Sequence, residues 1–374
     1  MQSFSFPTNI SIGPGVISQL PSYLKKHHLN RPLVVTDSVI QELPFFKKIL
    51  DDLRSNGLSP LVFSEINRNP LKSDVLKGKA AYQDHCDSVI GLGGGAALDV
   101  SRAVALSINH HRDLFEYDGL TGGTDLITEP IPHYVTVPTT AGTGSEVGRS
   151  AIISEDKSKR KRILFHPSLM ARFVFADPEL TYELPPEITA ATGMDAMAHH
   201  IEAYLAQGYH PMCDGIALQG IKMIWSSIER AVLNPDENSR SEMLMASLMG
   251  AVAFQKGLGI VHALSHPLST LLDMHHGLAN AVNLSYGCTF NLTASQERFK
   301  RIAVQLGLKQ GTEVPIALQE LNHRLGLPVK LSECGVTEGH IQALSELALA
   351  DFCLPQNPRT AGIEDIKSIY GEAL

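Results

Sequence analysis

The chain has 374 residues, of which 44% are hydrophobic and 19% are charged, and its formal net charge is −8 at pH 7. This length exceeds what one hydrophobic core usually supports, so we expect a globular protein of two domains. The negative charge and the absence of a long basic run argue against nucleic acid as a partner, and no apolar run reaches the length that spans a membrane.

Cysteine usage and the first residues indicate the compartment. The five cysteines are scattered and form no CxxC pair, which predicts neither a disulfide framework nor a thiolate zinc site. The start, MQSFSFPTNI, lacks the charged and apolar regions of a signal peptide. We therefore expect a cytoplasmic protein.

Up to about residue 185, short runs of β-branched residues alternate with helical stretches. The expected strands are RPLVVTD, LVFSEI, DSVIGLG, HYVTVP and FVFADPEL, and the expected helices extend to about residue 55, from about 72 to 85, and from Ala96 to Ile108. Strands that alternate with helices pair in parallel, so residues 1–185 are predicted to form a doubly wound α/β domain. From residue 186, Ala-, Leu- and Met-rich segments with helical periodicity predict an all-α domain over residues 186–374.

A glycine loop follows the strand DSVIGLG. Gly93, Gly94 and Gly95 lack the side chains that would keep a phosphate from the N–H groups at the start of the next helix. The order differs from a usual Rossmann domain, because the strand-end acid Asp37 lies upstream of the loop. A second polar loop, PTTAGTGSE at residues 138–146, favours a bound dinucleotide over a tight turn without a ligand.

The position of Asp37 at the end of a strand predicts that the cofactor is NAD rather than NADP. Ser38 and Gln41 have the spacing of a capping box, which would leave the Asp37 carboxylate free for the ribose hydroxyls. The alternative is that Asp37 itself serves the N-terminus of the next helix. A 2′-phosphate beside the carboxylate would be repelled by about 4 kcal/mol, for unit charges ~4 Å apart at an effective dielectric constant of ~20.

Seven of the sixteen histidines lie between residues 199 and 276. In GMDAMAHHIEAY, Asp195 and His199 are four residues apart, which places them together on a helix at the border of its apolar stripe. His262 and His266 repeat this spacing, and His276 follows. A single helical histidine commonly has a structural role, but a carboxylate at an apolar stripe needs a partner. One Asp with several His suits Fe²⁺ or Zn²⁺ better than calcium or magnesium.

The chain resembles the iron-containing (group III) alcohol dehydrogenase family over nearly its whole length. The resemblance is carried by an ordered set of motifs: VVTD, NP, GLGGGAALD, PTTAGTGSEV, DPEL, GMDAMAHHIEAY, VHALSHPLS, HHGLANAV and NPR. It implies an α/β NAD-binding domain and a helical metal-binding domain of the dehydroquinate synthase-like architecture. It also implies a homodimer or higher homo-oligomer, and a divalent metal, Fe²⁺ with Zn²⁺ as the alternative.

The resemblance also implies roles for individual residues. The metal ligands that it implies are Asp195, His199, His262 and His276, and it places His266 close to the metal. The cofactor contacts that it implies are Asp37, Asn69, Gly94, Gly95, Ala96, Thr139, Thr140, Lys161 and Leu180.

Two segments depart from the family pattern. Ala96 and Ala97 follow the glycine loop in place of the usual Ser-Pro, so backbone N–H groups must bind the pyrophosphate without that hydroxyl. The segment AFQKGLG is one residue shorter than its family counterpart at the expected substrate pocket. Its Lys256 could meet the anionic tail of a hydroxy acid such as 4-hydroxybutyrate, and the alternative is a solvated surface lysine.

These features predict a metal-dependent oxidoreductase that transfers hydride between NAD(H) and a small alcohol or aldehyde. His266 is the predicted proton relay, and its alternatives are a fifth metal ligand or an orienter of His262. Two other functions stay open. A non-redox enzyme of the dehydroquinate synthase type would use a Glu/His/His site, and a non-catalytic metal-binding protein would leave the glycine loop unexplained.

Overall fold

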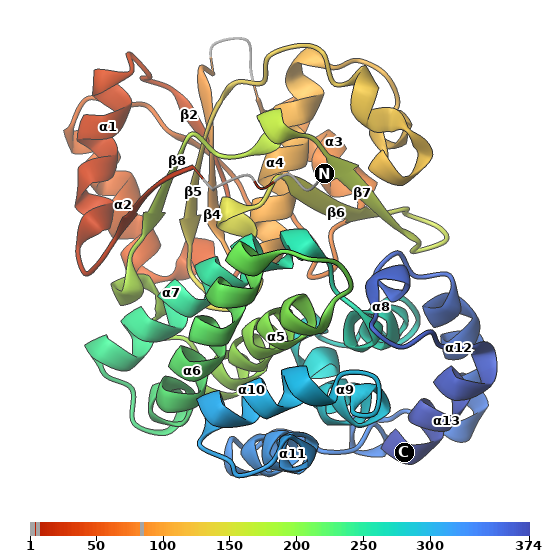
Figure 1. Cartoon of the computed structure of the whole chain (residues 1–374). Coiled ribbons are helices and arrows are strands. Elements are labelled where there is room, and N and C mark those ends of the chain that lie inside the picture. The colour runs from red at the N-terminus through yellow and green to blue at the C-terminus, as the bar shows by residue number, and fades with distance from the viewer. Residues whose placement is uncertain (1–3, 5–7, 83–85) are drawn as a thin grey trace. The chain divides into compact units, whose positions relative to one another are not determined.

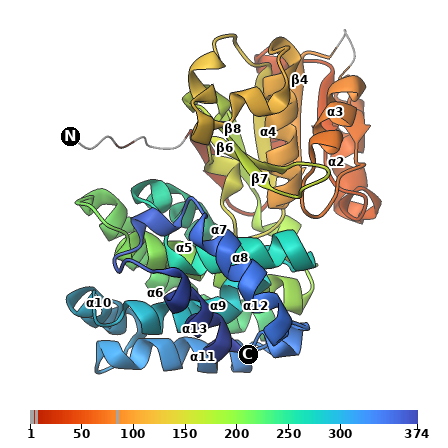
Figure 2. The same ribbon diagram turned by 90° about the vertical axis from the view of Figure 1, so that its right-hand side faces the viewer.

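The computed structural model describes residues 4, 8–82 and 86–374. The chain divides into two compact units, one over Phe6–Thr140 and Gly144–Tyr182, and the other including Ala141–Thr143 and Glu183–Leu374. The first is a sheet covered by helices, and the second is built from helices (Figures 1 and 2). The predicted α/β and all-α classes are therefore confirmed, whereas the exact division after residue 185 stays a prediction.

The α/β unit is built on a six-stranded parallel sheet in the order β1-β8-β5-β4-β2-β3. Its strands are β1 Asn9–Ile12, β2 Pro32–Val35, β3 Leu61–Phe63, β4 Ser88–Gly93, β5 His133–Pro138 and β8 Phe173–Ala176. The chain runs outward from β2 to β3 and then returns to β4 on the other side of β2. Ligands of open α/β sheets bind outside the carboxyl ends of the strands at such a reversal.

Helices cover both faces of this sheet (Figure 1). On one face, α1 Leu20–Lys26 and α2 Pro44–Ser55 pack with Ile90 and other sheet residues. On the opposite face, α3 Lys72–Ala81 and α4 Gly95–Asn109 pack with Val89 and its same-face neighbours. Burial on both faces explains why the strand sequences are nearly continuous apolar runs.

Several elements of this unit were not predicted from the sequence. The edge strand β1 and the helix α1 were missed, as was an antiparallel hairpin of β6 Ser150–Ser154 and β7 Lys161–Phe165. The hairpin and β1 are short and half-polar, so they lack the apolar run that marks the central strands. The helix predicted to reach residue 85 ends at Ala81, and residues 83–85 lie outside the described part of the chain.

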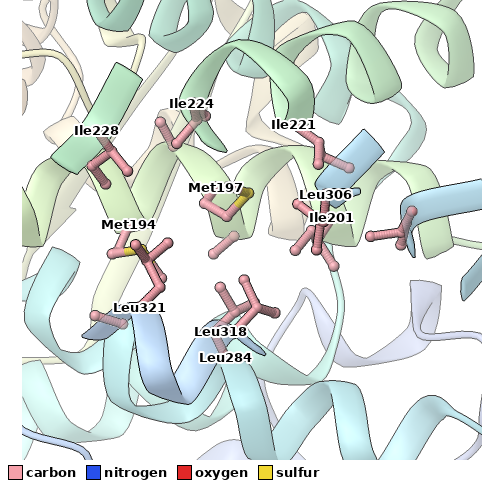
Figure 3. Close-up of a cluster of buried hydrophobic side chains, with 14 of the residues drawn as sticks. Met194, Met197, Ile201, Ile221, Ile224, Ile228, Leu284, Leu306, Leu318 and Leu321 are labelled. Atoms are coloured by element: carbon pink, nitrogen blue, oxygen red, sulfur yellow. The ribbon is translucent and has the colours of Figure 1, made fainter. Parts of the chain in front are cut away.

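The helical unit is organised around α5, which packs on α6, α7 and α9. Met194, Met197 and Ile201 of α5 lie in a buried cluster with apolar side chains of α6, α9, α10 and α11 (Figure 3). Full burial of each such side chain contributes about 1.5–3 kcal/mol. The bounds of the helices are α5 Pro186–Leu205, α6 Pro211–Leu233, α7 Glu237–Ala253, α8 Ile260–Leu272, α9 His276–Asn291, α10 Gln296–Leu306, α11 Val314–Arg324, α12 Ile341–Leu349 and α13 Ile363–Ala373.

Among the described helices, none taken singly has the length and apolar composition that crossing a membrane would require. One bent pair, Glu237–Lys256 with Ile260–Leu272, meets that test when the two helices are taken together, by length and composition only.

Candidate metal centre and cofactor loop

Three helices of the second unit bring the four predicted metal ligands together. Oδ1 of Asp195 on α5 lies 3.9 Å from Nε2 of His199, 3.8 Å from Nε2 of His262 on α8 and 3.8 Å from Nε2 of His276 at the start of α9. The ligand atoms of Asp195, His262 and His276 all lie within 4.8 Å of one another. Nε2 of His199 lies at a similar distance from Asp195, but His199 does not belong to this tighter group of three residues. Three ring nitrogens thus surround one carboxylate oxygen.

The chemistry of these donors fits a divalent transition metal. Burial lowers the pKa of His199 to about 4, so its imidazole is neutral near pH 7 and keeps a lone pair for a metal. The Asp195 side chain is only 2% exposed, and a buried carboxylate among neutral rings needs a compensating positive charge. Imidazole nitrogens with one carboxylate are donors that suit Fe²⁺ and Zn²⁺.

Glu202, which the sequence reasoning missed, orients His262. One of its oxygens, Oε1, accepts a hydrogen bond of 2.7 Å from the Val261 N–H, and Oε2 accepts from Nδ1 of His262. Burial lowers the pKa of His262, but the charge and hydrogen bond of Glu202 outweigh burial and raise it. Because Nδ1 keeps its proton toward Glu202, Nε2 is the ring atom turned to Asp195. The spacing of Asp195, His199 and Glu202 along one face of α5 could have identified Glu202 from the sequence.

Asn280 is a second residue that the sequence reasoning missed. Its Nδ2 donates a hydrogen bond of 2.6 Å to Oδ1 of Asp195 and lies 3.2 Å from Nε2 of both His262 and His276. Asn280 follows His276 by one helical turn in α9, so the spacing within HHGLAN could have identified it from the sequence. The amide helps to hold the Asp195 carboxylate in its orientation.

A glycine lets α9 begin close to α5. A Cβ added at Gly277 would lie 2.6 Å from the carbonyl oxygen of Ala191, a distance that side chains do not tolerate. A larger residue would push the start of α9, and with it His276, away from Asp195.

His266 lies beside the predicted metal ligands His262 and His276, but it is held by another carboxylate. Its Nδ1 is 2.7 Å from Oδ2 of Asp351, and its ring stacks on His276 and on Phe352 at centroid distances of 5.4 and 5.2 Å. Burial raises the pKa of Asp351, but the charge and hydrogen bond of His266 and the hydrogen bonds of Cys353 outweigh burial and lower it, so the carboxylate is ionised. The alternative that His266 orients His262 is wrong, because Nδ1 of His262 is bound to Glu202.

Lys256 is neither a free anion-binding group nor a solvated surface lysine. Its side chain is 2% exposed, and its Nζ donates hydrogen bonds of 2.6 Å to Oδ1 of Asp214 and 3.0 Å to the carbonyl oxygen of Tyr204. Arg298 pairs with the other oxygen of Asp214. The expected contact of Lys256 with a substrate carboxylate is therefore wrong, since its ammonium group is buried and already paired with Asp214 inside the helical unit.

In the α/β unit, the two polar loops meet at the carboxyl ends of β4 and β5. The N–H of Thr139 donates a 3.1 Å hydrogen bond to the carbonyl oxygen of Gly93, and a Cβ added at Gly94 would lie 3.4 Å from Oγ1 of Thr140. Gly94 is the N-cap of α4, and Gly95 and Ala96 are its first two residues. The first N–H groups of a helix have no partner within it, so this glycine-lined start of α4 is suited to a phosphate.

Asp37 lies after β2, at the strand-order reversal, but its local bonding differs from the expectation. Its Oδ1 accepts hydrogen bonds from the N–H groups of Val39 at 2.9 Å and Ile40 at 2.8 Å. The predicted Ser38–Gln41 capping box is therefore wrong, because Asp37 itself serves these N–H groups. Its other oxygen, Oδ2, lies toward the glycine loop, 3.8 Å from the position of a Cβ added at Gly93.

The remaining residues that were predicted to contact the cofactor lie on other segments of the same unit. Asn69 is followed by Pro70, whose carbonyl oxygen accepts a 2.8 Å hydrogen bond from Ser154 N–H, and Ser154 pairs with Lys161 in the hairpin. This pairing brings the segments of Asn69 and Lys161 together. Leu180 lies in a short 3-10 helix, Pro178–Thr181, that follows β8.

Comparison with known proteins matches both units to the same protein family. The family model "Iron-containing alcohol dehydrogenase" matches residues 7–178, and "Fe-containing alcohol dehydrogenase family, C-terminal" matches residues 189–374. The 4-hydroxybutyrate dehydrogenase of Cupriavidus necator is 38% identical, with 98% of each chain covered. The NAD-dependent methanol dehydrogenase of Bacillus methanolicus is 33% identical, with 100% of each chain covered.

A solved structure of a 1,3-propanediol oxidoreductase has a TM-score of 0.95 and 32% identity, with 100% of each chain covered. Relatives of this kind decide against the non-redox and the non-catalytic alternatives, because they are dehydrogenases over the whole length of the chain. The chain belongs to the iron-containing alcohol dehydrogenase family and is an oxidoreductase of the NAD-dependent alcohol dehydrogenase type.

Proposed function

We propose that this protein interconverts a small primary alcohol, in particular a hydroxy acid such as 4-hydroxybutyrate, with its aldehyde, using NAD(H) and Fe²⁺. The observation that carries the proposal is the buried Asp195 carboxylate with three histidine Nε2 atoms 3.8–3.9 Å from it. The four metal ligands in this proposal are Asp195, His199, His262 and His276. Zn²⁺ is the alternative metal, since the same donors suit it.

In this proposal, the metal, the cofactor and the protein side chains have separate roles in the reaction. A bound divalent metal supplies a Lewis acid that makes an alcohol hydroxyl more acidic and polarises a carbonyl, and NAD⁺ accepts the hydride. Glu202 keeps Nδ1 of His262 protonated and its Nε2 directed at Asp195. We assign the proton to His266, which accepts it during alcohol oxidation and donates it during aldehyde reduction.

The cofactor is proposed to bind at the carboxyl ends of β2, β4 and β5. The N–H groups at Gly94, Gly95 and Ala96 would hold the pyrophosphate without a hydroxyl, because alanines follow the loop. Thr139 and Thr140 border this loop, and Oδ2 of Asp37 is the oxygen available to a ribose hydroxyl. Asn69, Lys161 and Leu180 complete the proposed set.

The hydroxy acid is proposed because a relative with 38% identity is named a 4-hydroxybutyrate dehydrogenase. The test compares kcat/KM for 4-hydroxybutyrate and for 1-butanol, its uncharged analogue, by NADH absorbance at 340 nm. We expect a preference for 4-hydroxybutyrate of about tenfold or more, as a charge-assisted contact worth ~1.5 kcal/mol would give. A preference for 1-butanol would contradict the hydroxy acid assignment while leaving the alcohol dehydrogenase activity in place.

We further propose that the protein acts in the cytoplasm as a homodimer or higher homo-oligomer, with small molecules as its partners. The net charge of −8 supports the exclusion of nucleic acid. Light scattering of the purified protein tests the assembly, and a mass of one chain would contradict it.

A further inference from the structure

His266 is held by Asp351 and Phe352, which lie outside the proposed metal ligands, and by the ring of His276, which is one of them. Oδ2 of Asp351 lies 2.7 Å from its Nδ1. Phe352 stacks on the ring at 5.2 Å with an interplanar angle of 28°, and His276 stacks on it at 5.4 Å and 13°. A ring held by two stacking partners and by a hydrogen bond at one edge has a fixed orientation.

The Asp351 carboxylate is itself fixed. Its Oδ1 accepts a 2.9 Å hydrogen bond from the N–H of Cys353, so its Oδ2 is left for His266. The Asp351 side chain is 8% exposed, and water therefore competes little for these bonds. An ionised carboxylate can only accept, which means that Nδ1 of His266 is the donor.

We infer that Asp351 is a positioning residue that sets the tautomer of His266 for proton transfer. It holds the neutral imidazole with the proton on Nδ1, so that Nε2 carries the lone pair. This inference rests on the proposed function, in which His266 is the proton relay.

The step balances as follows. In alcohol oxidation, the C–H bond breaks and its hydride passes to NAD⁺, while the O–H bond breaks and its proton passes to Nε2 of His266. The products are the aldehyde, NADH and an imidazolium whose Nδ1–H still faces Asp351, and the imidazolium then releases the Nε2 proton to water. Aldehyde reduction runs through the same transfers in reverse. If Nε2 already carried the proton of the neutral ring, it could not accept another.

The N–H of Cys353 makes one substitution diagnostic. In Asp351→Asn, the amide oxygen is needed as the acceptor for Cys353 N–H, so the NH₂ group faces Nδ1 of His266. Nδ1 must then accept, and the proton moves to Nε2, which is the wrong tautomer. Asp351→Ala removes the partner without imposing either tautomer, although it leaves a cavity and costs more stability.

The experiment compares kcat of metal-loaded Asp351→Asn, Asp351→Ala and Asp351→Glu, with melting temperature measured alongside. We expect kcat to fall about 100-fold in the Asn variant, within the range of lost general acid–base catalysis, and clearly less in the Ala variant. We expect the Glu variant to recover part of the loss. The melting temperatures should follow the opposite order, with Ala below Asn, because only Ala leaves a cavity. A purely structural role would make the Ala variant the slower one, and that result would overturn the inference.

Asp214→Asn is the matched control, because it also removes a carboxylate with low exposure from the helical unit. Asp214 pairs with Lys256 and Arg298 and belongs to neither proposed site. We expect this variant to lose stability with a small effect on kcat. A drop in kcat as large as that of Asp351→Asn would show that loss of any such carboxylate slows the enzyme, and would overturn the specific role of Asp351.

Two further measurements separate the inference from the proposed function. If metal-loaded His266→Gln turns over at the wild-type rate, the relay in the proposed function is wrong. If His266→Gln is slow but Asp351→Asn is no slower than Asp351→Ala, only the role of Asp351 is wrong. ¹⁵N NMR of the histidines in the zinc-loaded wild type tests the tautomer of His266 directly, even if the Asn variant does not fold. The His266 signal, identified by its loss in His266→Gln, should show the proton on Nδ1, and a proton on Nε2 would overturn the inference.

Discussion

Asp195 contributes the negative charge that three histidine nitrogens surround, so its loss should first affect metal binding. Asp195→Asn keeps the size of the side chain but removes the charge, and we expect metal affinity to fall at least tenfold, with turnover falling in proportion to metal content. NADH affinity should stay within about twofold, because the glycine loop belongs to the other unit. Metal analysis and NADH fluorescence titration test both parts. A metal-free variant that turns over at the wild-type rate would refute the catalytic role of the metal.

Asp37 is expected to set the preference for NAD over NADP by its charge. Asp37→Asn keeps an acceptor for the N–H groups of Val39 and Ile40 and removes only the charge. Even a quarter of the ~4 kcal/mol repulsion estimated for a 2′-phosphate corresponds to several-fold discrimination. We therefore expect the ratio of kcat/KM for NADP to that for NAD to rise several-fold in Asp37→Asn. A wild-type enzyme that uses both cofactors equally well would contradict this assignment.

At the scale of residues, the sequence predicted a pair at helical spacing but missed Glu202 and Asn280, which share α5 and α9 with predicted metal ligands. Asp195 and His199 were found because a four-residue spacing is visible without a structure. Asp351 could not be found in this way, since 85 residues separate it from His266. Lys256 was misjudged because spacing carries no information about burial, and its partner Asp214 lies 42 residues away.

Glu202 couples two helices, because it extends from α5 to the first turn of α8. It accepts hydrogen bonds from the Val261 N–H and from Nδ1 of His262, so it stabilises the start of α8 and also orients His262, a proposed metal ligand. We expect Glu202→Gln to weaken metal binding by about 10- to 100-fold, the usual effect of losing such an orienting carboxylate. Competition with a chelator measures the change. Glu229→Gln, which alters a half-exposed pair with Arg324, is the control and should leave metal affinity unchanged. Equal metal affinities in the two variants would show that Glu202 does not support metal binding.

The loop after β5 is expected to make stability depend on pH. Burial raises the pKa of Glu146 to about 7, above its ordinary value of 4.5. The unfolded chain therefore loses this proton at lower pH than the folded one, so the contribution to stability is complete below about pH 4.5 and is lost as pH rises through about 7. Glu146→Gln should raise the melting temperature at pH 8, and the gain should shrink at pH 5. A gain of the same size at both values would show that Glu146 is not the titrating group.

Among the elements, the central strands were predictable and the edges were not. β4 is apolar throughout because both sheet faces are covered, whereas β1 (NISI) alternates polar and apolar residues at the sheet edge. The β6–β7 hairpin includes Lys161 and Arg162, the last two residues of the basic segment KSKRKR, so β7 begins with charged rather than apolar residues. Strand character there depends on pairing between segments, which a local pattern does not contain.

For the whole molecule, alternating strands and helices followed by a long helical region predicted both units of the fold. The exception is Ala141–Thr143, which belongs to the helical unit although it interrupts the α/β unit in the sequence. A Cβ added at Gly142 would lie 2.7 Å from Cβ of Thr192 on α5, so this tripeptide packs against that helix. Only the three-dimensional structure could assign it.

The central claim is that this chain is a metal-dependent NAD alcohol dehydrogenase whose metal is held around Asp195. The most direct measurement is NADH formation at 340 nm from NAD⁺ and 4-hydroxybutyrate or 1-butanol, with protein stripped of metal and then titrated anaerobically with Fe²⁺. We predict no turnover in the stripped protein, recovery that saturates at one metal per chain, and no comparable recovery in Asp195→Asn. Turnover by the stripped wild type at the rate of the reloaded enzyme would contradict the claim.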